Sequence, residues 1–205
     1  MLEHLKSGIL EIEEGVSMII AFTGAGISAE SGTPTFSEQP GIRDKLTRTF
    51  ARTHHDEYSK VVTGMMEACD KAEPNDAHKA LAEYDIPILT MNIDGLHTDA
   101  GSKVVIPLHG EFPNIVLYDD PAPNYKIAYD WVGRMRPEPE KDLLIFIGTS
   151  FYTNISNEIR RYANIFGVKT IIINKDAGRL VRKTLENFKD YIEPYDEFIK
   201  RPIYF

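Results

Sequence analysis

Five short apolar runs, with helical segments between several of them, constrain the fold of this chain of 205 residues more than any other feature. Runs that are apolar throughout, without alternation, are typical of parallel strands buried on both faces. Strands that alternate with helices indicate an α/β fold, an open parallel sheet with helices on both faces. The runs are Met18–Phe22, Ile86–Thr90, Lys103–Leu108, Leu143–Ile147 and Thr170–Ile173.

The spacing of apolar residues also predicts helices. We expect Asn75 to cap the helix before the second run and Gly167 to end the helix before the last run. The aromatic residues of one helix, Tyr125–Met135, fit a core face or an exposed contact surface. The predicted helices are residues 2–12, Asp76–Tyr84, Tyr125–Met135, Asn154–Phe166 and Asp176–Phe188.

Two stretches depart from this rhythm of strands and helices. Residues 37–72 are polar with helical spacing, and they predict a small helical lobe, or flap, inserted into the sheet-forming sequence. Residues 111–140 are rich in proline and in acidic side chains. The length favours one domain over residues 1–205. Its sheet-forming core is expected at residues 15–36, 73–119 and 141–190.

The charge balance argues against a broad nucleic-acid surface, because 23 Lys and Arg against 31 Asp and Glu give a net charge of −8. The single cysteine, Cys69, excludes an intramolecular disulfide and a cysteine-rich zinc site. No apolar run approaches the roughly 20 residues that span a bilayer. We therefore expect a cytoplasmic protein with no nucleic-acid partner, no membrane partner and no bound metal.

The segment Ala21–Phe36 passes from the first run into a glycine-rich turn. Glycines such as Gly24 and Gly26 let a backbone approach a pyrophosphate, and a following helix start supplies N–H donors. Gly32 comes too late for the regular G-x-G-x-x-G pattern of dinucleotide-binding proteins. The glycine spacing therefore fits a phosphate-binding loop or a tight structural turn equally well.

Polar residues also follow the second and third runs, at strand ends where parallel sheets bind ligands. Asn92 and Asp94 together offer donors and acceptors for a ribose or a carboxamide, or else form a structural Asx turn. His109 follows the third run, and a histidine there is a candidate general base, although a lone histidine is also commonly structural.

The ends of the last two runs carry small polar residues: Gly148, Thr149 and Ser150 after the fourth run, and Asn174 after the fifth. Such residues suit ribose and phosphate contacts, and they equally suit helix N-caps. All five segments follow a strand of the same predicted sheet, so we expect them to converge along one edge.

Taken together, these segments resemble the sirtuins, the family of NAD-dependent protein deacylases. The resemblance implies an inverted Rossmann-like parallel sheet with a small lobe, and it identifies the chain as a short, divergent member. The matching motifs, in the order of the family, are Gly24–Gly32, Pro74–Leu81, Asn92–His97, His109–Gly110, Asp142–Ser150 and Ile172–Asn174.

The resemblance also implies roles for individual residues. Asn92 would orient the nicotinamide ribose, Asp94 would contact the carboxamide, and His109 would deprotonate a ribose hydroxyl. The implied substrate-binding residues are Val116, Leu117 and Tyr118. The implied NAD-binding residues are Gly24, Ala25, Gly26, Ser28, Thr35, Phe36, Met91, Ile93, Gly148, Thr149, Ser150 and Asn174.

The chain departs from the family pattern at four places. The zinc ribbon that follows the His-Gly motif in the family is absent, which predicts that no zinc is bound. Met91 stands where the family has a glutamine, and a thioether is only a weak acceptor. Ser37 stands where the family has an arginine, while Arg43 lies near the aromatic position of the cofactor loop. Residues 118–120, Tyr-Asp-Asp, replace Phe-Gly-Glu in the peptide-binding loop.

Three functions are compatible with this pattern. The first is an NAD-dependent protein-lysine deacylase of the deacetylase type, which acts on acylated-lysine proteins or peptides and releases nicotinamide and O-acyl-ADP-ribose. The second is a sirtuin-like NAD glycohydrolase or protein ADP-ribosyltransferase, suggested by Met91, Ser37 and the altered peptide loop. The third is a non-catalytic module that binds NAD or ADP-ribose.

Overall fold

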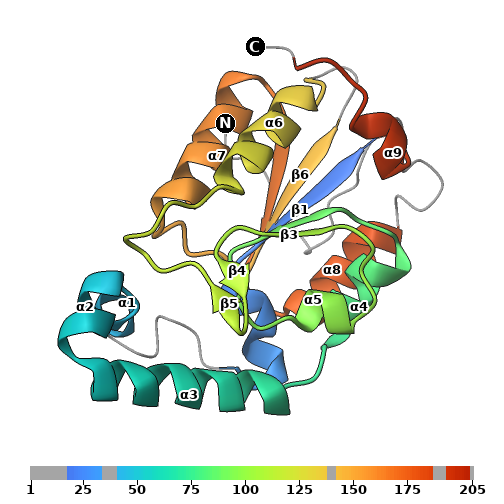
Figure 1. Ribbon diagram of the computed structural model, residues 1–205. Helices are drawn as coiled ribbons and strands as arrows, with labels where there is room; N and C mark the ends of the chain where they lie inside the picture. The colour runs from blue at the N-terminus through green and yellow to red at the C-terminus, as the bar shows by residue number, and fades with distance from the viewer. Residues whose placement is uncertain (1–17, 34–40, 138–141, 187–192, 204–205) are drawn as a thin grey trace.

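The structure is a computed structural model that describes residues 18–33, 41–137, 142–186 and 193–203. Its centre is a sheet of five parallel strands in the order β3-β2-β1-β6-β7 (Figure 1). All five predicted strands form, with small differences at their ends. The strands are β1 (Ile19–Thr23), β2 (Ile88–Thr90), β3 (Val105–Pro107), β6 (Leu143–Ile147) and β7 (Lys169–Ile173).

Both faces of the sheet are buried, which explains why the central strands are apolar throughout. In β1, Ile19 and Ala21 belong to the core on one face, and Ile20 and Phe22 to the core on the other. Helices cover each face as expected (Figure 1). One face carries α4 (Asp76–Glu83) and α8 (Ala177–Glu186); the other carries α6 (Tyr125–Arg134), α7 (Asn154–Ile165) and α9 (Tyr195–Phe198).

The predicted helix signals have clear structural counterparts. Asn75 is the N-cap of α4, and its side chain accepts hydrogen bonds from the backbone amides of Ala77 and His78. Gly167 follows the C-cap of α7 with a φ of 69°. The aromatic residues of α6 belong mainly to the core, because Trp131 is buried against Tyr195 and Phe198 of α9. The helix expected at residues 2–12 lies outside the described residues.

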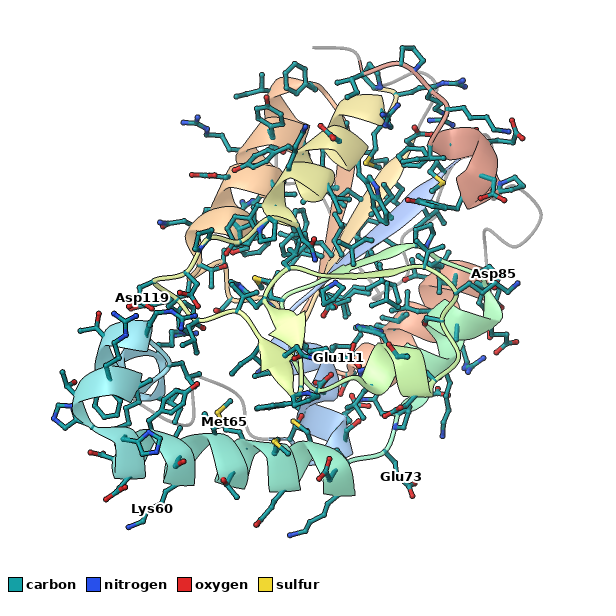
Figure 2. The ribbon with its side chains drawn as sticks, in the orientation of Figure 1. Lys60, Met65, Glu73, Asp85, Glu111 and Asp119 are labelled. Carbon is teal, nitrogen blue, oxygen red and sulfur yellow. The ribbon has the colours of Figure 1, made fainter. Side chains whose placement is uncertain are left out.

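The predicted helical lobe contains three helices: α1 (Ile42–Lys45), α2 (Arg48–Thr53) and α3 (His55–Lys71). It lies at one end of the sheet, with α3 as its outer layer (Figure 1). None of the residues of α3 is fully buried. Met65 points from α3 toward the rest of the protein, whereas Lys60 points away from it (Figure 2).

A short antiparallel hairpin follows directly after His109. It pairs β4 (Gly110–Glu111) with β5 (Asn114–Ile115) through a turn at Phe112 and Pro113. The amide of Phe112 donates to the carbonyl of Ile93 at 3.1 Å, which attaches the hairpin to the loop after β2. The chain thus turns back within a few residues of His109.

Candidate active site

A cavity of about 260 Å³ lies at the carboxyl ends of the strands, where the sequence predicts a site. All five polar segments contribute to its wall, together with the helical lobe and the loop after β5. Its lining residues are Gly24, Ala25, Gly26, Arg43, Met91, Asn92, His109, Tyr118, Gly148, Thr149, Ser150, Tyr152, Thr153, Asn174 and Lys175.

The glycine turn after β1 is packed against the end of β6. Gly24 donates to the carbonyl of Ile147 at 2.9 Å, and Gly26 donates to that of Gly148 at 2.8 Å. A Cβ atom on Gly26 would lie 2.7 Å from the Gly148 oxygen. The requirement for glycine therefore comes first from this backbone contact, which agrees with the tight structural turn that the sequence analysis left open beside a phosphate-binding loop. The helix expected after the turn is a 3-10 helix, η1 (Ala25–Ser31).

Ser28, Asn92 and Asp94 form one hydrogen-bonded group beside the cavity. The Ser28 hydroxyl donates to Asp94 Oδ2 at 2.7 Å, and Asn92 Nδ2 lies 3.0 Å from the Ser28 oxygen and 3.2 Å from Asp94 Oδ2. Asn92 is among the residues that line the cavity, and Ser28 and Asp94 are bonded to its side chain. Burial raises the pKa of Asp94, while its hydrogen bonds to Ser28 and to the Leu96 amide lower it.

Asn92 presents an acceptor that the protein itself does not use. Its Oδ1 atom is buried and has no hydrogen-bond partner among the described residues. Buried polar atoms are nearly always hydrogen-bonded, so an acceptor of this kind at a cavity wall is suited to a ligand hydroxyl or amide.

Two buried histidines lie close to this hydrogen-bonded group and to the end of β1. His78 Nε2 lies 3.4 Å from the Ser28 oxygen, and His97 Nε2 lies 2.9 Å from Oγ1 of Thr23. Burial lowers the pKa of His78 to about 4 and that of His97 well below its ordinary value, so both rings are neutral at pH 7. In the sequence, His78 falls within the predicted helix Asp76–Tyr84 and has no assigned role. The contact with Ser28 depends on how η1 packs against α4, which no local pattern reports.

His109 lies at the boundary between the main cavity and a small pocket of about 20 Å³. Burial lowers its pKa, so the imidazole is neutral near pH 7 and able to accept a proton. The expected substrate residues and Ile93 line the small pocket, whose walls are mainly apolar. The lining residues are Leu46, Met91, Ile93, His109, Ile115, Val116, Leu117 and Tyr118.

Several cavity residues escape the analysis of the sequence. Arg43 of α1 is the clearest, because its guanidinium lies 4.4 Å from the ring centroid of Tyr152 and bonds to the side chain of Tyr118. Thr153 also lines the cavity, and its hydroxyl donates to the sulfur of Met91 at 3.1 Å. These contacts join the lobe and distant loops, and the only signal in the sequence was the position of Arg43 near the cofactor loop.

Asp119 and Asp120, in the loop after β5, bond to the helical lobe. Asp119 accepts hydrogen bonds from the amides of Arg48 and Thr49 at the start of α2, at 2.5 and 3.1 Å. Asp120 forms an ion pair with Arg48, and Asp119 faces the same lobe in Figure 2. The amide of Tyr118 donates to the Leu46 carbonyl at 3.0 Å. The loop is thus attached to the lobe by both backbone and side chains.

The residues present suit NAD better than a metal ion. A tight backbone turn, the unpartnered Asn92 oxygen and the cationic Arg43 line one cavity, as a dinucleotide with hydroxyls and a pyrophosphate requires. Within the described part of the chain, no group of three or more His, Cys, Asp or Glu side chains could hold a metal. Thr35 and Phe36, expected in the NAD site, lie outside the described residues.

No helix of the described residues is long and apolar enough to cross a membrane.

Among known proteins, a family model described as the Sir2 family matches residues 24–119. An NAD-dependent protein deacetylase of Saccharolobus solfataricus is 31% identical and covers 86% of this chain and 86% of its own. An NAD-dependent protein deacylase of Thermococcus kodakarensis is 45% identical over 44% of this chain and 40% of its own.

Solved structures share the fold. A Sir2 homologue in complex with NAD superposes with a TM-score of 0.76 at 22% identity, over 86% of this chain and 91% of its own. A Sir2 protein in complex with an inhibitor, 2′-O-acetyl-ADP-ribose and a deacetylated p53 peptide gives 0.70 at 24% identity, over 82% of this chain and 93% of its own. Given the match of its motifs and a relative 31% identical over most of both chains, this chain belongs to the Sir2 family.

Proposed function

We propose that this chain is an NAD-dependent protein-lysine deacylase of the deacetylase type. The observation that carries this proposal is the meeting of three features in one cavity. These are the glycine turn at residues 24–26, the unpartnered Asn92 oxygen and the neutral imidazole of His109. NAD supplies, when bound, a glycosidic bond whose nicotinamide is a good leaving group.

The side chains have distinct tasks in this proposal. Asn92 accepts a hydrogen bond from a ribose hydroxyl, and Ser28 and Asp94 hold its amide in place through their hydrogen bonds. His109 accepts a proton from a ribose hydroxyl, which lets the acyl group pass to the sugar. Consumption of NAD, acyl-lysine and water yields nicotinamide, free lysine and O-acyl-ADP-ribose.

In this proposal the small apolar pocket beside His109 marks where the acyl-lysine side chain enters, and its volume of about 20 Å³ has to widen to admit that chain. Val116, Leu117 and Tyr118 line it, and Tyr118 also lines the main cavity. The solved Sir2 complex that contains a deacetylated peptide and an acetylated ADP-ribose supports a protein or peptide partner here. The short hairpin after His109, together with the single cysteine, supports a segment after His109 that folds without a zinc ion.

Mass spectrometry of the products tests the proposal directly. The purified chain is incubated with NAD and with acetyl-, succinyl- or longer acyl-lysine peptides, and a control contains no peptide. We expect O-acyl-ADP-ribose and deacylated peptide in at least one peptide reaction, with nicotinamide release that depends on the peptide. Nicotinamide release at the same rate in every reaction, without deacylated peptide, would disprove a deacylase.

A second candidate, an NAD glycohydrolase or ADP-ribosyltransferase, is favoured by one observation. The loop at Tyr118–Asp120 is attached to the helical lobe through Leu46, Arg48 and Thr49. Some hydrogen-bonding groups that a peptide could use are therefore already bonded within the protein. A narrowed peptide path would leave water or another nucleophile to react. The same experiment would then yield free ADP-ribose, or ADP-ribose attached to protein, in every reaction.

A further inference from the structure

A tyrosine from α6 contacts His109 from outside the two cavities. The Tyr125 hydroxyl lies 3.4 Å from His109 Nε2, and the two rings meet edge to face with centroids 5.6 Å apart. His109 lines both cavities, whereas Tyr125 lines neither of them. Tyr125 therefore approaches the imidazole from the protein side, where it does not compete for the substrate.

The start of α6 is attached to the strand that carries His109. The neighbouring side chain, Asn124, donates from Nδ2 to the carbonyl oxygen of Pro107 at 2.7 Å. Pro107 is the last residue of β3, two positions before His109. The rest of α6 is secured by the buried side chains of Trp131 and Val132. The position of the Tyr125 hydroxyl relative to His109 is thus set by a helix and a strand that are bonded together.

Tyr118 lies near the imidazole as well, but with a different relation to it. Its ring centroid is 5.7 Å from that of His109, while its hydroxyl bonds to Arg43. In the described part of the chain, Tyr125 therefore supplies the tyrosine hydroxyl that contacts the imidazole. Burial raises the pKa of Tyr125 to about 12, so this hydroxyl keeps its proton and can both donate and accept.

We propose that Tyr125 is a positioning residue for His109, and this inference rests on the proposed deacylase function. Its oxygen accepts a hydrogen bond from Nε2–H, which fixes the rotation and the tautomer of the imidazole and leaves Nδ1 to take the proton. Because Nε2 carries its hydrogen before and after Nδ1 takes a proton, the contact with Tyr125 is kept through the step. The distance of 3.4 Å is long for a hydrogen bond, and such contacts commonly shorten when a ligand binds.

The test compares two rates in Tyr125→Phe, which removes the hydroxyl and keeps the ring. Incorporation of labelled nicotinamide into NAD, in the presence of acyl-peptide, reports cleavage and re-formation of the glycosidic bond. Release of deacylated peptide also needs the proton transfer to His109. We expect deacylation to fall roughly tenfold, with nicotinamide exchange and NAD affinity within about twofold of wild type.

The matched control is Tyr129→Phe, one turn further along α6, where the hydroxyl bonds to Glu158 instead. It should leave both rates unchanged. Asn124→Ala is a second variant that removes the tie to Pro107, and it should change the ratio of the two rates in the same direction as Tyr125→Phe.

Three results would overturn the inference while the wild type is active. They are an equal fall in both rates, no change in either rate, or the same change in Tyr129→Phe. If the wild-type chain releases no deacylated peptide from any acyl-peptide, the proposed function fails first. That outcome is seen before any variant is compared, so the two failures are distinguishable.

Discussion

The amide of Gly26 donates to the carbonyl of Gly148 at 2.8 Å, so the turn after β1 and the turn after β6 are in direct backbone contact. Gly148 has a φ of 64°, and a Cβ atom there would overlap the amide of Ile27. This contact forms one wall of the cavity at the sheet edge. It makes the shape of the candidate NAD site depend on two loops more than 120 residues apart in sequence.

Gly148→Ala should therefore destabilise the protein by about 2 kcal/mol or more, because the methyl group combines a backbone overlap with an unfavourable φ. Thermal and urea unfolding measure the loss. The control is Gly64→Ala in α3, where a Cβ atom meets nothing within 4 Å. It should stabilise the helix by about 0.5–1 kcal/mol. Equal stability of the two variants would contradict this view of the turn.

The stability of the fold should decline in mild acid because His78 and His97 are buried as neutral rings. Burial lowers the folded-state pKa of His78 from 6.5 to about 4, so unfolding takes up protons below pH 6.5. The stabilisation is complete above pH 6.5 and is lost as the pH falls toward 4, by about 3 kcal/mol for this residue.

Urea unfolding between pH 7 and pH 4.5 measures this loss. The variant His78→Gln should be less stable at pH 7 and should show a shallower decline with acid. His55→Gln, an exposed position at the start of α3, should follow the wild-type slope. Parallel curves for His78→Gln and the wild type would show that another group causes the decline.

Deacylation should require the neutral form of His109. Because burial lowers its pKa below the ordinary value of 6.5, kcat should hold at pH 7 and fall as the pH drops below 6.5. His109→Ala should reduce deacylation by roughly 10²-fold or more. His55→Ala is the control. An acidic limb centred above pH 7, or a His109→Ala variant of near wild-type activity, would exclude His109 as the base.

Arg43→Ala should weaken NAD binding by about tenfold, as expected when one charged contact to a pyrophosphate is lost. Arg43 lines the cavity, while Arg52 is exposed on α2 of the same lobe and provides the control Arg52→Ala. Isothermal titration with NAD measures both affinities. If the two variants bind alike, Arg43 serves only to hold Tyr118 and Tyr152 at the cavity rim.

The sequence predicted most of the sheet because burial on both faces requires unbroken apolar runs, and that requirement is visible within a few residues. Leu143–Ile147 forms a strand with the predicted ends, and β2 begins two residues later than expected, after Pro87, which lacks an N–H donor. The placement of the polar segments at one sheet edge follows from the same rule, since parallel strands share their carboxyl ends.

The described residues do not test several other expectations. The helix at residues 2–12 and the roles of Thr35 and Phe36 lie outside them, and a cytoplasmic location stays a prediction. Ser28 and Asp94 are bonded to each other and to Asn92, and their expected contacts with NAD stay predictions. Spacing along a chain shows which strand end a residue follows, but not how deep its side chain lies.

The sequence by itself thus determined which apolar runs form strands, which polar residues follow them and the family resemblance. Only the tertiary structure decided which groups meet: Ser28 with Asn92, 64 positions apart, and Tyr125 with His109, 16 positions apart. Such contacts depend on how a lobe, a hairpin and a helix pack over one sheet edge. That packing is set by interactions summed over the whole chain, so no local pattern records it.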